Sequence, residues 1–242
     1  MPRVSAIITT TGRSTLIEAV ESVIDQTFGD WEMIIVNDGF MGFNPTFSDE
    51  RIRVIKNSKR LGGCKSLNVG LREAKGEYIA ILDDDDRWVS LDKLERQVKF
   101  LDEHPDYIAC GTNPQSGQGE EIKINLTGTP FAHVSMMFRK GLLYDERLER
   151  AKDLDMMVRL SQIGKLGLIK DCSVSFAISK DLNKKIDDCQ WHRKVCLMHK
   201  EMPDWMRVYI SLWIRELKLR YYKVKNRLFG TTPQNNTGAT DR

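Results

Sequence analysis

The sequence from residue 77 to residue 88 reads EYIAILDDDDRW, and this stretch decides the fold. Its apolar part, Tyr78 to Leu82, is typical of a short strand buried on both faces of a parallel sheet. Four aspartates follow that strand without a break. The simplest interpretation of an acidic run is a solvated turn that favours the next helix N-terminus. Uncompensated charges at a buried strand end are costly, however, so the context favours a site for a metal ion and a phosphate group.

Strand and helix patterns alternate around this stretch. We expect strands at residues 4–9, 32–36, 53–55 and 78–82, and helices from Ser14 to about residue 28, from residues 62–63 to Ala74, and for about twelve residues after Ser90. This order predicts an α/β fold with a Rossmann-like, mostly parallel central sheet flanked by helices. Ligands of such sheets bind at the carboxyl ends of the strands. Three polar groups should therefore meet in one crevice: Thr9–Thr11, Asn37–Asp38 and Asp83–Asp86.

The second half of the sequence is less regular. We expect a loop at 113–120, strands at 131–138, 166–170 and 173–178, and helices at 153–163, 184–200 and 204–227. The predicted organisation is one domain over residues 1–200, with a nucleotide-binding half at about 1–112 and an acceptor half at about 113–200. A basic, aromatic helical appendage at 204–229 follows, and then a polar tail at 230–242 whose composition predicts disorder.

The composition limits the class of protein. The chain has 242 residues, a hydrophobic content of 41% and a net charge of +3. Residues 205–229 hold seven Arg or Lys against one Glu, which gives +6, so the remainder carries −3 and no nucleic-acid-binding surface is expected. The five cysteines form no CxxC pair, and no apolar run is long enough for a signal peptide or a membrane span. These features predict a reducing, cytoplasmic location.

Four segments, in order, resemble the family 2 glycosyltransferases of the GT-A fold. They are VSAIITTTGR with the later VIDQTF, then EMIIVNDG, then GGCKSLNVGLREAKGEYIAILDDDDRW, and finally DLDMMVRL at 153–160. One such motif would be weak, whereas four at family-like spacing over about 160 residues make a strong signal. The resemblance implies an inverting, metal-dependent enzyme that moves a sugar from a nucleotide-diphosphate donor, here UDP-sugar, to the hydroxyl of a glycan or lipid-linked glycan.

The resemblance also implies residue roles. Asp83, Asp84 and Asp85 match the DXD motif, with Asp83 near the ribose and Asp85 as the main ligand of Mn²⁺ or Mg²⁺. Such ions are held by hard oxygen ligands, bridge carboxylate to phosphate and stabilise the departing diphosphate. Asp153 matches the catalytic base, which would take a proton from the acceptor hydroxyl.

The expected nucleotide-binding set is completed by four residues outside the acidic run. Thr9 and Asp38 match positions that hold the uracil and ribose, Thr11 lies in the same crevice, and Lys65 would supply positive charge for the phosphates. The sequence departs from the family pattern at several positions: Thr10 and Thr11 replace a Pro and an aromatic residue, Asn37 replaces an Asp, Leu67 an Arg, Lys152 an acid, and Ser179 a metal-binding His.

Other features leave alternatives open. Asp153 could instead cap the helix that follows it, and His133 could be structural or could contact the acceptor or diphosphate. The residues Cys189, His192, Cys196 and His199 resemble a zinc pattern, but they would spread over roughly 15 Å of one helix, so a packed helix face is expected. Residues 205–229 could lie on a membrane surface, pack on the domain or form a dimer contact.

Two rival functions remain at this point. A nucleotidyltransferase would also use metal-binding carboxylates on an α/β sheet, although it should carry a Gly-rich basic loop after the first strand, where TTTGRS has one Gly and one Arg. A nucleotide-sugar-binding module without catalytic activity is the third hypothesis, and the departures from the family pattern leave room for it.

Overall fold

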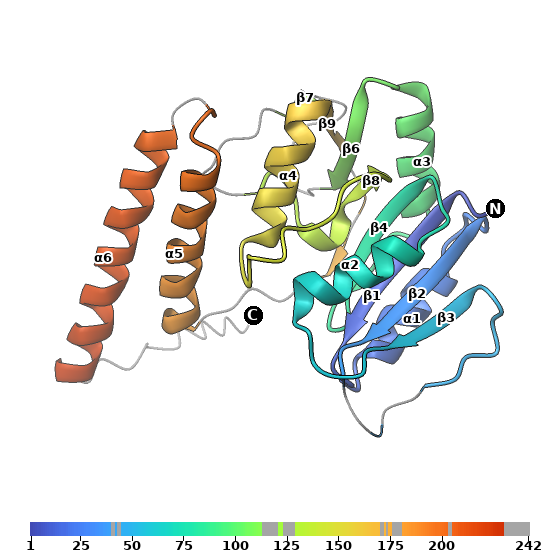
Figure 1. Cartoon of the computed structure of the whole chain (residues 1–242), viewed down its shortest axis with the longest axis horizontal. Helices are drawn as coiled ribbons and strands as arrows, with labels where there is room; N and C mark the ends of the chain where they lie inside the picture. Colours follow the sequence, from blue (N-terminus) through green and yellow to red (C-terminus); the bar gives the residue numbers. More distant parts are fainter. Residues whose placement is uncertain are drawn as a thin grey trace, which may run out of the picture.

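The centre of the protein is one sheet of eight strands in the order β3-β2-β1-β4-β8-β6-β9-β7 (Figure 1). The computed structural model describes residues 1–39, 42, 45–112, 121–122, 129–169, 172, 174–175, 181–202 and 205–229. Strands β3, β2, β1 and β4 run parallel to one another, and β6 runs parallel to β9. The predicted α/β architecture with a mostly parallel sheet is confirmed.

The first half of the chain builds the parallel strands and their connecting helices. They are β1 (Val4–Thr10), α1 (Leu16–Ile24), β2 (Trp31–Asn37), β3 (Ile52–Lys56), α2 (Gly63–Glu73), β4 (Tyr78–Asp83), β5 (Arg87–Trp88) and α3 (Lys93–Glu103). The four strands expected here are confirmed, each to within one residue at either end. Asp83 forms the last residue of β4, so the acidic run begins inside the sheet.

Alternation along the strands separates two hydrophobic layers. In β1, Ile7 packs into the layer that also contains residues of α2 and α4, while Val4, Ala6 and Ile8 pack into the layer that contains residues of α1 and α3. Successive side chains of a strand point to opposite faces, so both faces of β1 are buried. The helices therefore cover the sheet from both sides and leave the carboxyl ends of its strands available.

The second half completes the sheet. Its elements are β6 (Tyr107–Thr112), β7 (Glu121–Ile122), a 3₁₀ turn (His133–Ser135), β8 (Met137–Arg139), α4 (Lys152–Ile163), β9 (Lys165–Ile169) and β10 (Val174–Ser175). The three-residue strand β8 runs antiparallel between β4 and β6 and so joins the two halves. The expected strands near 166–170 and 173–178 correspond to β9 and to the short β10, which pairs with β5. The expected loop at 113–120 lies outside the described residues.

The prediction of one strand over residues 131–138 is wrong. Residues 133–135 form a 3₁₀ turn, and only 137–139 are a strand. Ser135 Oγ donates to Ala132 O at 2.7 Å and accepts from Thr112 N–H at 3.0 Å, while Trp88 Nε1 donates to Val134 O at 2.8 Å. These bonds take backbone groups away from a ladder, which the apolar letters of the run did not reveal.

Ser14 and Ser90, which would cap the two helices expected to follow them, are not the N-caps of those helices. Helix α1 has Thr15, not Ser14, at its N-cap, and α3 has Asp92, not Ser90, and neither cap side chain bonds the first turn. Helix α1 ends at Ile24, before the expected residue 28. Gln26 explains part of the difference, because its Oε1 accepts from Leu94 N–H at 3.0 Å and ties the end of α1 to α3.

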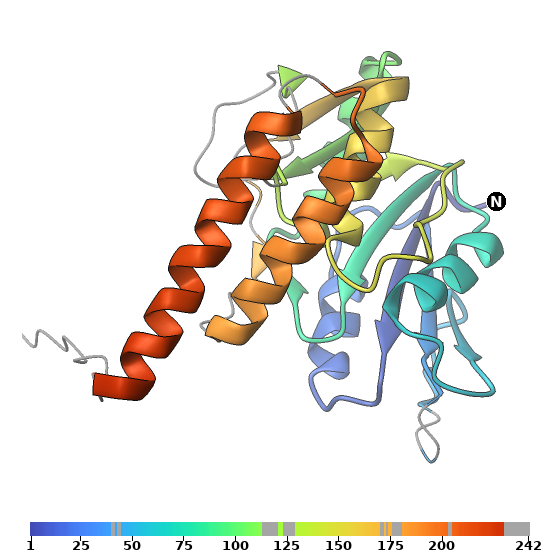
Figure 2. The same ribbon diagram turned by 60° about the vertical axis from the view of Figure 1, so that its left-hand side comes forward.

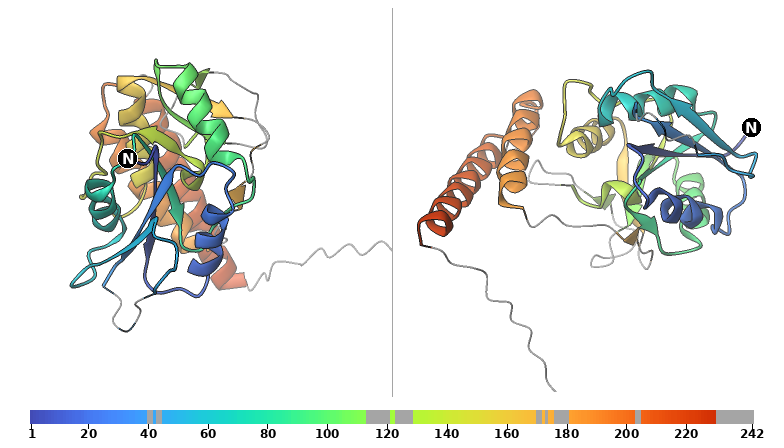
Figure 3. Two further views of the ribbon diagram at one scale, coloured as in Figure 1. Left: turned by 90° about the vertical axis from the view of Figure 1, so that its right-hand side faces the viewer. Right: turned by 90° about the horizontal axis from the view of Figure 1, so that it is seen from below.

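Helices α5 (Leu182–Met198) and α6 (Trp205–Phe229) form an antiparallel pair beside α4, with α6 outermost (Figures 2 and 3). Glu216 of α6 is buried and bonds Arg193 of α5 at 2.6 Å and Gln190 Nε2 at 2.9 Å. Both predicted helices are confirmed, α6 extending to Phe229. In the described part of the chain, no helix combines the length and apolarity that a membrane crossing requires. The tail at 230–242 falls outside that part.

Candidate active site

A cavity of about 350 Å³ lies at the carboxyl ends of β1, β2 and β4. Six of the residues expected to bind nucleotide or metal line it: Thr9, Thr11, Asp38, Asp83, Asp84 and Asp85. The sheet produces this arrangement because the parallel strands deliver their following residues to one edge. Thr9 pairs with Asp83 across β1 and β4, and Thr10 pairs with Asn37 across β1 and β2. The three polar groups thus converge as the sequence predicts.

The acidic run is not uniform in its surroundings. Asp83 is half-buried, Asp84 is 5% exposed, and the side chain of Asp85 is 45% exposed. Asp84 Oδ2 accepts from Thr10 Oγ1 at 2.6 Å. Burial raises the pKa of Asp84 above its ordinary value of 3.8, although the Thr10 hydroxyl and the Arg13 charge oppose that rise. Asp84 therefore fixes the run against β1, while Asp85 points to the open side of the cavity.

Arg13 joins two of the carboxylates. Its Nη1 lies 2.9 Å from Asp84 Oδ1 and 2.6 Å from Asp85 Oδ2. A single positive atom between two carboxylates from adjacent residues shows that the pair converges on one cation position. The Arg13 side chain is 52% exposed, so no packing holds it there against a competing ion.

This position suits the divalent ion that the resemblance implies. Magnesium is commonly held by one or two carboxylates, with substrate phosphates and water completing its shell. Within the described part of the chain, no group of three or more His, Cys, Asp or Glu side chains is arranged to hold a metal. The residues present therefore fit an ion that binds together with a diphosphate, with Asp84 and Asp85 as its protein partners, rather than a permanently caged ion.

Asp38 accepts four hydrogen bonds from the protein itself. Its Oδ1 accepts from Leu61 N–H at 2.7 Å, Ser66 Oγ at 2.7 Å and Asn57 Nδ2 at 3.3 Å, and its Oδ2 accepts from Gly62 N–H at 3.0 Å. Burial alone would raise the pKa of Asp38, but these donors outweigh burial and hold it below 3.8. Asp38 thus organises the loop that starts α2, at the floor of the cavity.

The positive charge of the cavity comes from other residues than the expected Lys65. Arg13, Arg60 and Lys184 line it, from the end of β1, the loop before α2 and the first turn of α5. Lys65 instead lines a neighbouring hollow with Glu146 and Glu149. The Arg60 backbone is positioned by Gly39, whose φ is +76° and where a Cβ would lie 2.3 Å from Arg60 N. The sequence around Lys184 does not predict this role. Lys184 reaches the cavity only because the first turn of α5 lies close to the sheet in the folded chain.

Asp153 lies in the first turn of α4, near the cavity but not in its lining. The capping alternative is wrong, because Ala151, with φ of 54°, occupies the N-cap and Asp153 follows it by two residues. The preceding Lys152 reaches back to the cavity, since a Cβ at Gly63 would lie 3.1 Å from Lys152 Nζ. The Asp153 carboxylate is consequently half-buried and is not committed to its own helix.

The pair of His133 and Tyr144 is subject to the charges of both Asp83 and Asp153. His133 Nε2 is 2.8 Å from Tyr144 Oη. Burial lowers the pKa of His133, and the Asp83 and Asp153 charges act on it in the opposite direction. Both carboxylates therefore lie within electrostatic range of the same imidazole. His133 has a definite structural partner, which the sequence left open.

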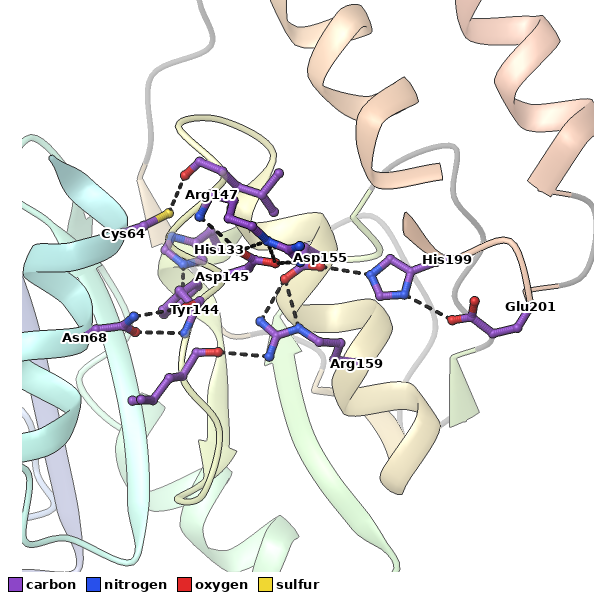
Figure 4. Close-up of polar contacts among 12 residues, drawn as sticks. Cys64, Asn68, His133, Tyr144, Asp145, Arg147, Asp155, Arg159, His199 and Glu201 are labelled. Carbon is purple, nitrogen blue, oxygen red and sulfur yellow. Dashed lines mark hydrogen bonds and ion pairs between the residues drawn. The ribbon is translucent and has the colours of Figure 1, made fainter. Parts of the chain in front are cut away.

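A hydrogen-bonded network connects α2, the segment before α4, α4 and the end of α5 (Figure 4). Asn68 bonds both backbone groups of Tyr144. Asn68 Nδ2 donates to Tyr144 O at 2.9 Å, and Asn68 Oδ1 accepts from Tyr144 N–H at 2.8 Å. Asp155 is 1% exposed and accepts from Arg159 at 2.7 Å, and its Oδ1 lies 2.9 Å from His199 Nε2. This network sets the start of α4, and with it Asp153, relative to the nucleotide half.

The resemblance to a zinc pattern on α5 has a packing explanation. Cys189 and Cys196 are buried, and His199 ends the helix in contact with Asp155 and Glu201. The expected packed helix face is therefore confirmed for these three residues. All five cysteines are buried, and none of them forms a disulfide. Ser179, the position expected in place of a metal-binding His, lies outside the described residues.

The chain belongs to glycosyl transferase family 2, whose family model matches residues 5–159. One relative is an uncharacterized glycosyltransferase, MJ1057, of Methanocaldococcus jannaschii, 33% identical over 193 residues, a match covering 65% of this chain and 64% of the relative. The match thus spans just under two thirds of that relative's length.

Two solved structures share the fold. The mannosyltransferase PcManGT from Pyrobaculum calidifontis, in complex with GDP-Man and Mn²⁺, matches with a TM-score of 0.68 and 17% identity, covering 96% of this chain and 77% of that chain. S. aureus TarS 1-349 in complex with UDP-GlcNAc matches with a TM-score of 0.65 and 16% identity, covering 90% and 73%. The GT-A fold implied by the sequence is confirmed, and the nucleotidyltransferase hypothesis falls with the family assignment.

Proposed function

We propose that this glycosyltransferase moves a sugar from a UDP-sugar to a hydroxyl of a glycan or lipid-linked glycan, with inversion at the anomeric carbon and with Mn²⁺ or Mg²⁺. The observation that carries the proposal is the convergence of Asp84 and Asp85 on one cation, Arg13 Nη1, at the strand ends where a nucleotide binds. A bound divalent ion would neutralise the diphosphate and stabilise the charge that develops on it.

The remaining roles belong to protein groups. Thr9, Thr11 and Asp83 face the same cavity and are proposed to contact the nucleoside, while Arg60 and Lys184 are proposed to face the phosphates. Asp38 is proposed to act by shaping the loop before α2, because it accepts from the backbone N–H groups of Leu61 and Gly62 in that loop. Lys65, in the neighbouring hollow, is the weaker candidate for a phosphate contact.

Asp153 is proposed as the base. Its carboxylate would take the proton of the acceptor hydroxyl as that oxygen attacks the anomeric carbon. The bond from the anomeric carbon to the phosphate oxygen would break, and its electron pair would leave with the nucleoside diphosphate. A single displacement on the face opposite the leaving group inverts the configuration. The position of Asp153 supports this role, because Ala151 and not Asp153 occupies the N-cap of α4.

The test separates donor binding from transfer. For Asp153→Asn we expect metal-dependent donor binding, measured by calorimetry, to stay near wild type, while transfer falls about 10²- to 10⁴-fold. For Asp85→Ala we expect both binding and transfer to fall. Glu103→Gln, an exposed carboxylate of α3, is the matched control and should change neither.

The same assays decide between the proposal and the non-catalytic module. Transfer near the wild-type level in Asp153→Asn or Asp85→Ala would refute the assigned role of that residue. Donor binding by the wild type without transfer to any acceptor would favour a binding module. The coupling constant of the anomeric proton, measured by NMR, reports the anomeric configuration of the product. A configuration opposite to that of the donor sugar shows inversion.

A further inference from the structure

Helix α6 carries a continuous apolar surface on the side that faces away from the domain. Six large side chains recur at helical spacing on it, and each is between 44% and 62% exposed. We call them the α6 stripe: Ile210, Trp213, Ile214, Leu217, Tyr221 and Val224. Helix α6 is the outermost helix (Figure 2). Scattered exposed hydrophobic residues are ordinary, but a contiguous row of them indicates an interaction surface.

The opposite side of α6 already satisfies the fold. Val208 and Leu212 are buried in the core layer shared with α5, and Glu216 is buried against Arg193 and Gln190. The α5–α6 pair therefore needs nothing from the α6 stripe for its own packing. Exposing six large apolar side chains to water has no structural purpose within the described chain.

Positive charges border the stripe on both edges. At about 100° per residue, Lys218 lies beyond Ile214 on one edge, and Arg220 lies beyond Trp213 on the other. Both are exposed, and the side chain of Arg220 is 52% exposed although it also bonds Glu216. Glu216 is the only acid in α6, and it faces inward. The outer face is thus apolar along its centre and cationic at its borders.

We propose that the α6 stripe docks on the surface of an anionic lipid bilayer. An apolar row can enter the boundary of the acyl chains while flanking Lys and Arg contact negative headgroups. Charge distinguishes this partner from a second copy of the chain. Two stripes packed together would bring cationic borders against each other, with no outward acid on α6 to compensate.

The test uses the full chain and co-sedimentation with vesicles. The wild type should pellet with vesicles that contain phosphatidylglycerol, should pellet much less with pure phosphatidylcholine, and should release as salt rises. Lys218→Glu should weaken binding by at least about fivefold, since each positive charge contributes about fivefold. Trp213→Ser with Leu217→Ser should weaken it at least about tenfold.

The controls match each change elsewhere on the surface. Ile163→Ser removes an exposed apolar side chain from α4, and Lys99→Glu reverses an exposed charge on α3, and both should bind like wild type. Circular dichroism checks folding. If a stripe variant unfolds, the lipid and salt dependence of the wild type still decides: no pelleting with anionic vesicles overturns the proposal.

Two further outcomes would also overturn it. If Trp213→Ser with Leu217→Ser binds vesicles as tightly as the wild type, the α6 stripe does not contact the bilayer. A wild-type dimer that the stripe variant dissociates, seen by analytical ultracentrifugation, would assign the surface to a second copy. Pelleting is independent of sugar transfer, so this result stands apart from the test of the proposed reaction.

Discussion

Asp38 shows how a residue that resembles a ligand contact can serve the fold. A carboxylate accepts all four of its donors, whereas an amide in its place would turn an NH₂ group toward a backbone N–H. For Asp38→Asn we expect a loss of about 2–3 kcal/mol in the free energy of unfolding, measured by urea denaturation at pH 7. Since the folded pKa of Asp38 is lowered, its contribution is present above the unfolded pKa and is lost as pH falls below it.

The matched control for Asp38 is Asp49→Asn, because Asp49 bonds only Arg51 nearby on the surface. That change should cost less than about 1 kcal/mol. A stable Asp38→Asn variant that fails to bind donor would contradict the structural role. It would show instead that Asp38 contacts the nucleotide.

Lys93 is a buried cation with a poor electrostatic environment. It is fully buried, donates to Gln97 Oε1 at 2.6 Å and lies 4.0 Å from the Trp88 ring centre, and no ion pair among the described residues includes it. Burial lowers the pKa of Lys93 from 10.5 to about 8. We expect Lys93→Met to raise the free energy of unfolding at pH 7 by about 1–2 kcal/mol, the gain from removing a buried charge less the lost hydrogen bond.

The stability difference between Lys93→Met and the wild type should depend on pH. Between the folded pKa of about 8 and the unfolded value of 10.5, the unfolded chain binds more protons at Lys93, so this group makes the wild type more stable as pH rises. The advantage of Lys93→Met should therefore be complete below pH 8 and shrink above it. The exposed Lys99→Met on the same helix is the control. An advantage that stays constant up to high pH would rule out the charge as its cause.

At the scale of elements, His199 couples the α5–α6 pair to α4. Both ring nitrogens lie near carboxylates, Asp155 at 2.9 Å and Glu201 at 3.2 Å, and the Asp155 hydrogen bond raises the pKa of His199 above 6.5. The stabilisation is thus fully present below the unfolded pKa and is lost as pH rises through the folded one. For His199→Gln at pH 6 we expect the free energy of local opening in residues 205–229 to fall by about 1–3 kcal/mol. The amide hydrogens of this helix should then exchange faster than in the wild type.

The difference in exchange rate between wild type and His199→Gln should shrink as pH rises through the folded pKa of His199, because the wild-type imidazole then becomes neutral. His104→Gln, on α3 and bonded to the Phe100 carbonyl, is the control and should leave exchange in α6 unchanged. Equal exchange in wild type and His199→Gln at every pH would show that packing alone holds the helix pair.

Predictability also differs between elements. The strands of the parallel half were foreseen because each is a compact apolar run bounded by turn residues. Strand β6 was missed, since its letters YIACGT contain little β-branched sequence and its partners, β8 and β9, are distant in the chain. The strand-end rule located Asp38 and Asp83–Asp85 correctly, whereas Lys184 and the contact of His199 with Asp155 depend on where α5 returns, which no local pattern encodes.

At the scale of the whole molecule, donor binding should be visible as stability. Ligand at about one hundred times its Kd adds about 2.7 kcal/mol to the native state, which for a chain of this size corresponds to roughly 5–10 °C in Tm. We expect UDP with Mn²⁺ to shift Tm more than UDP with a chelator. GDP with Mn²⁺ should shift it less than UDP with Mn²⁺, and a larger shift with GDP would reassign the base of the donor.

The three-residue strand β8 imposes an order on the assembly of this protein. Strands β1 to β4 come from the first 83 residues and pair in parallel with one another, whereas in the described sheet β6 is joined to β4 through β8, residues 137–139. During synthesis the first half of the chain can close its parallel strands before β8 has left the ribosome. The open edge of β4 is therefore exposed to wrong partners during that interval, and its completion by β8 joins both halves in one step.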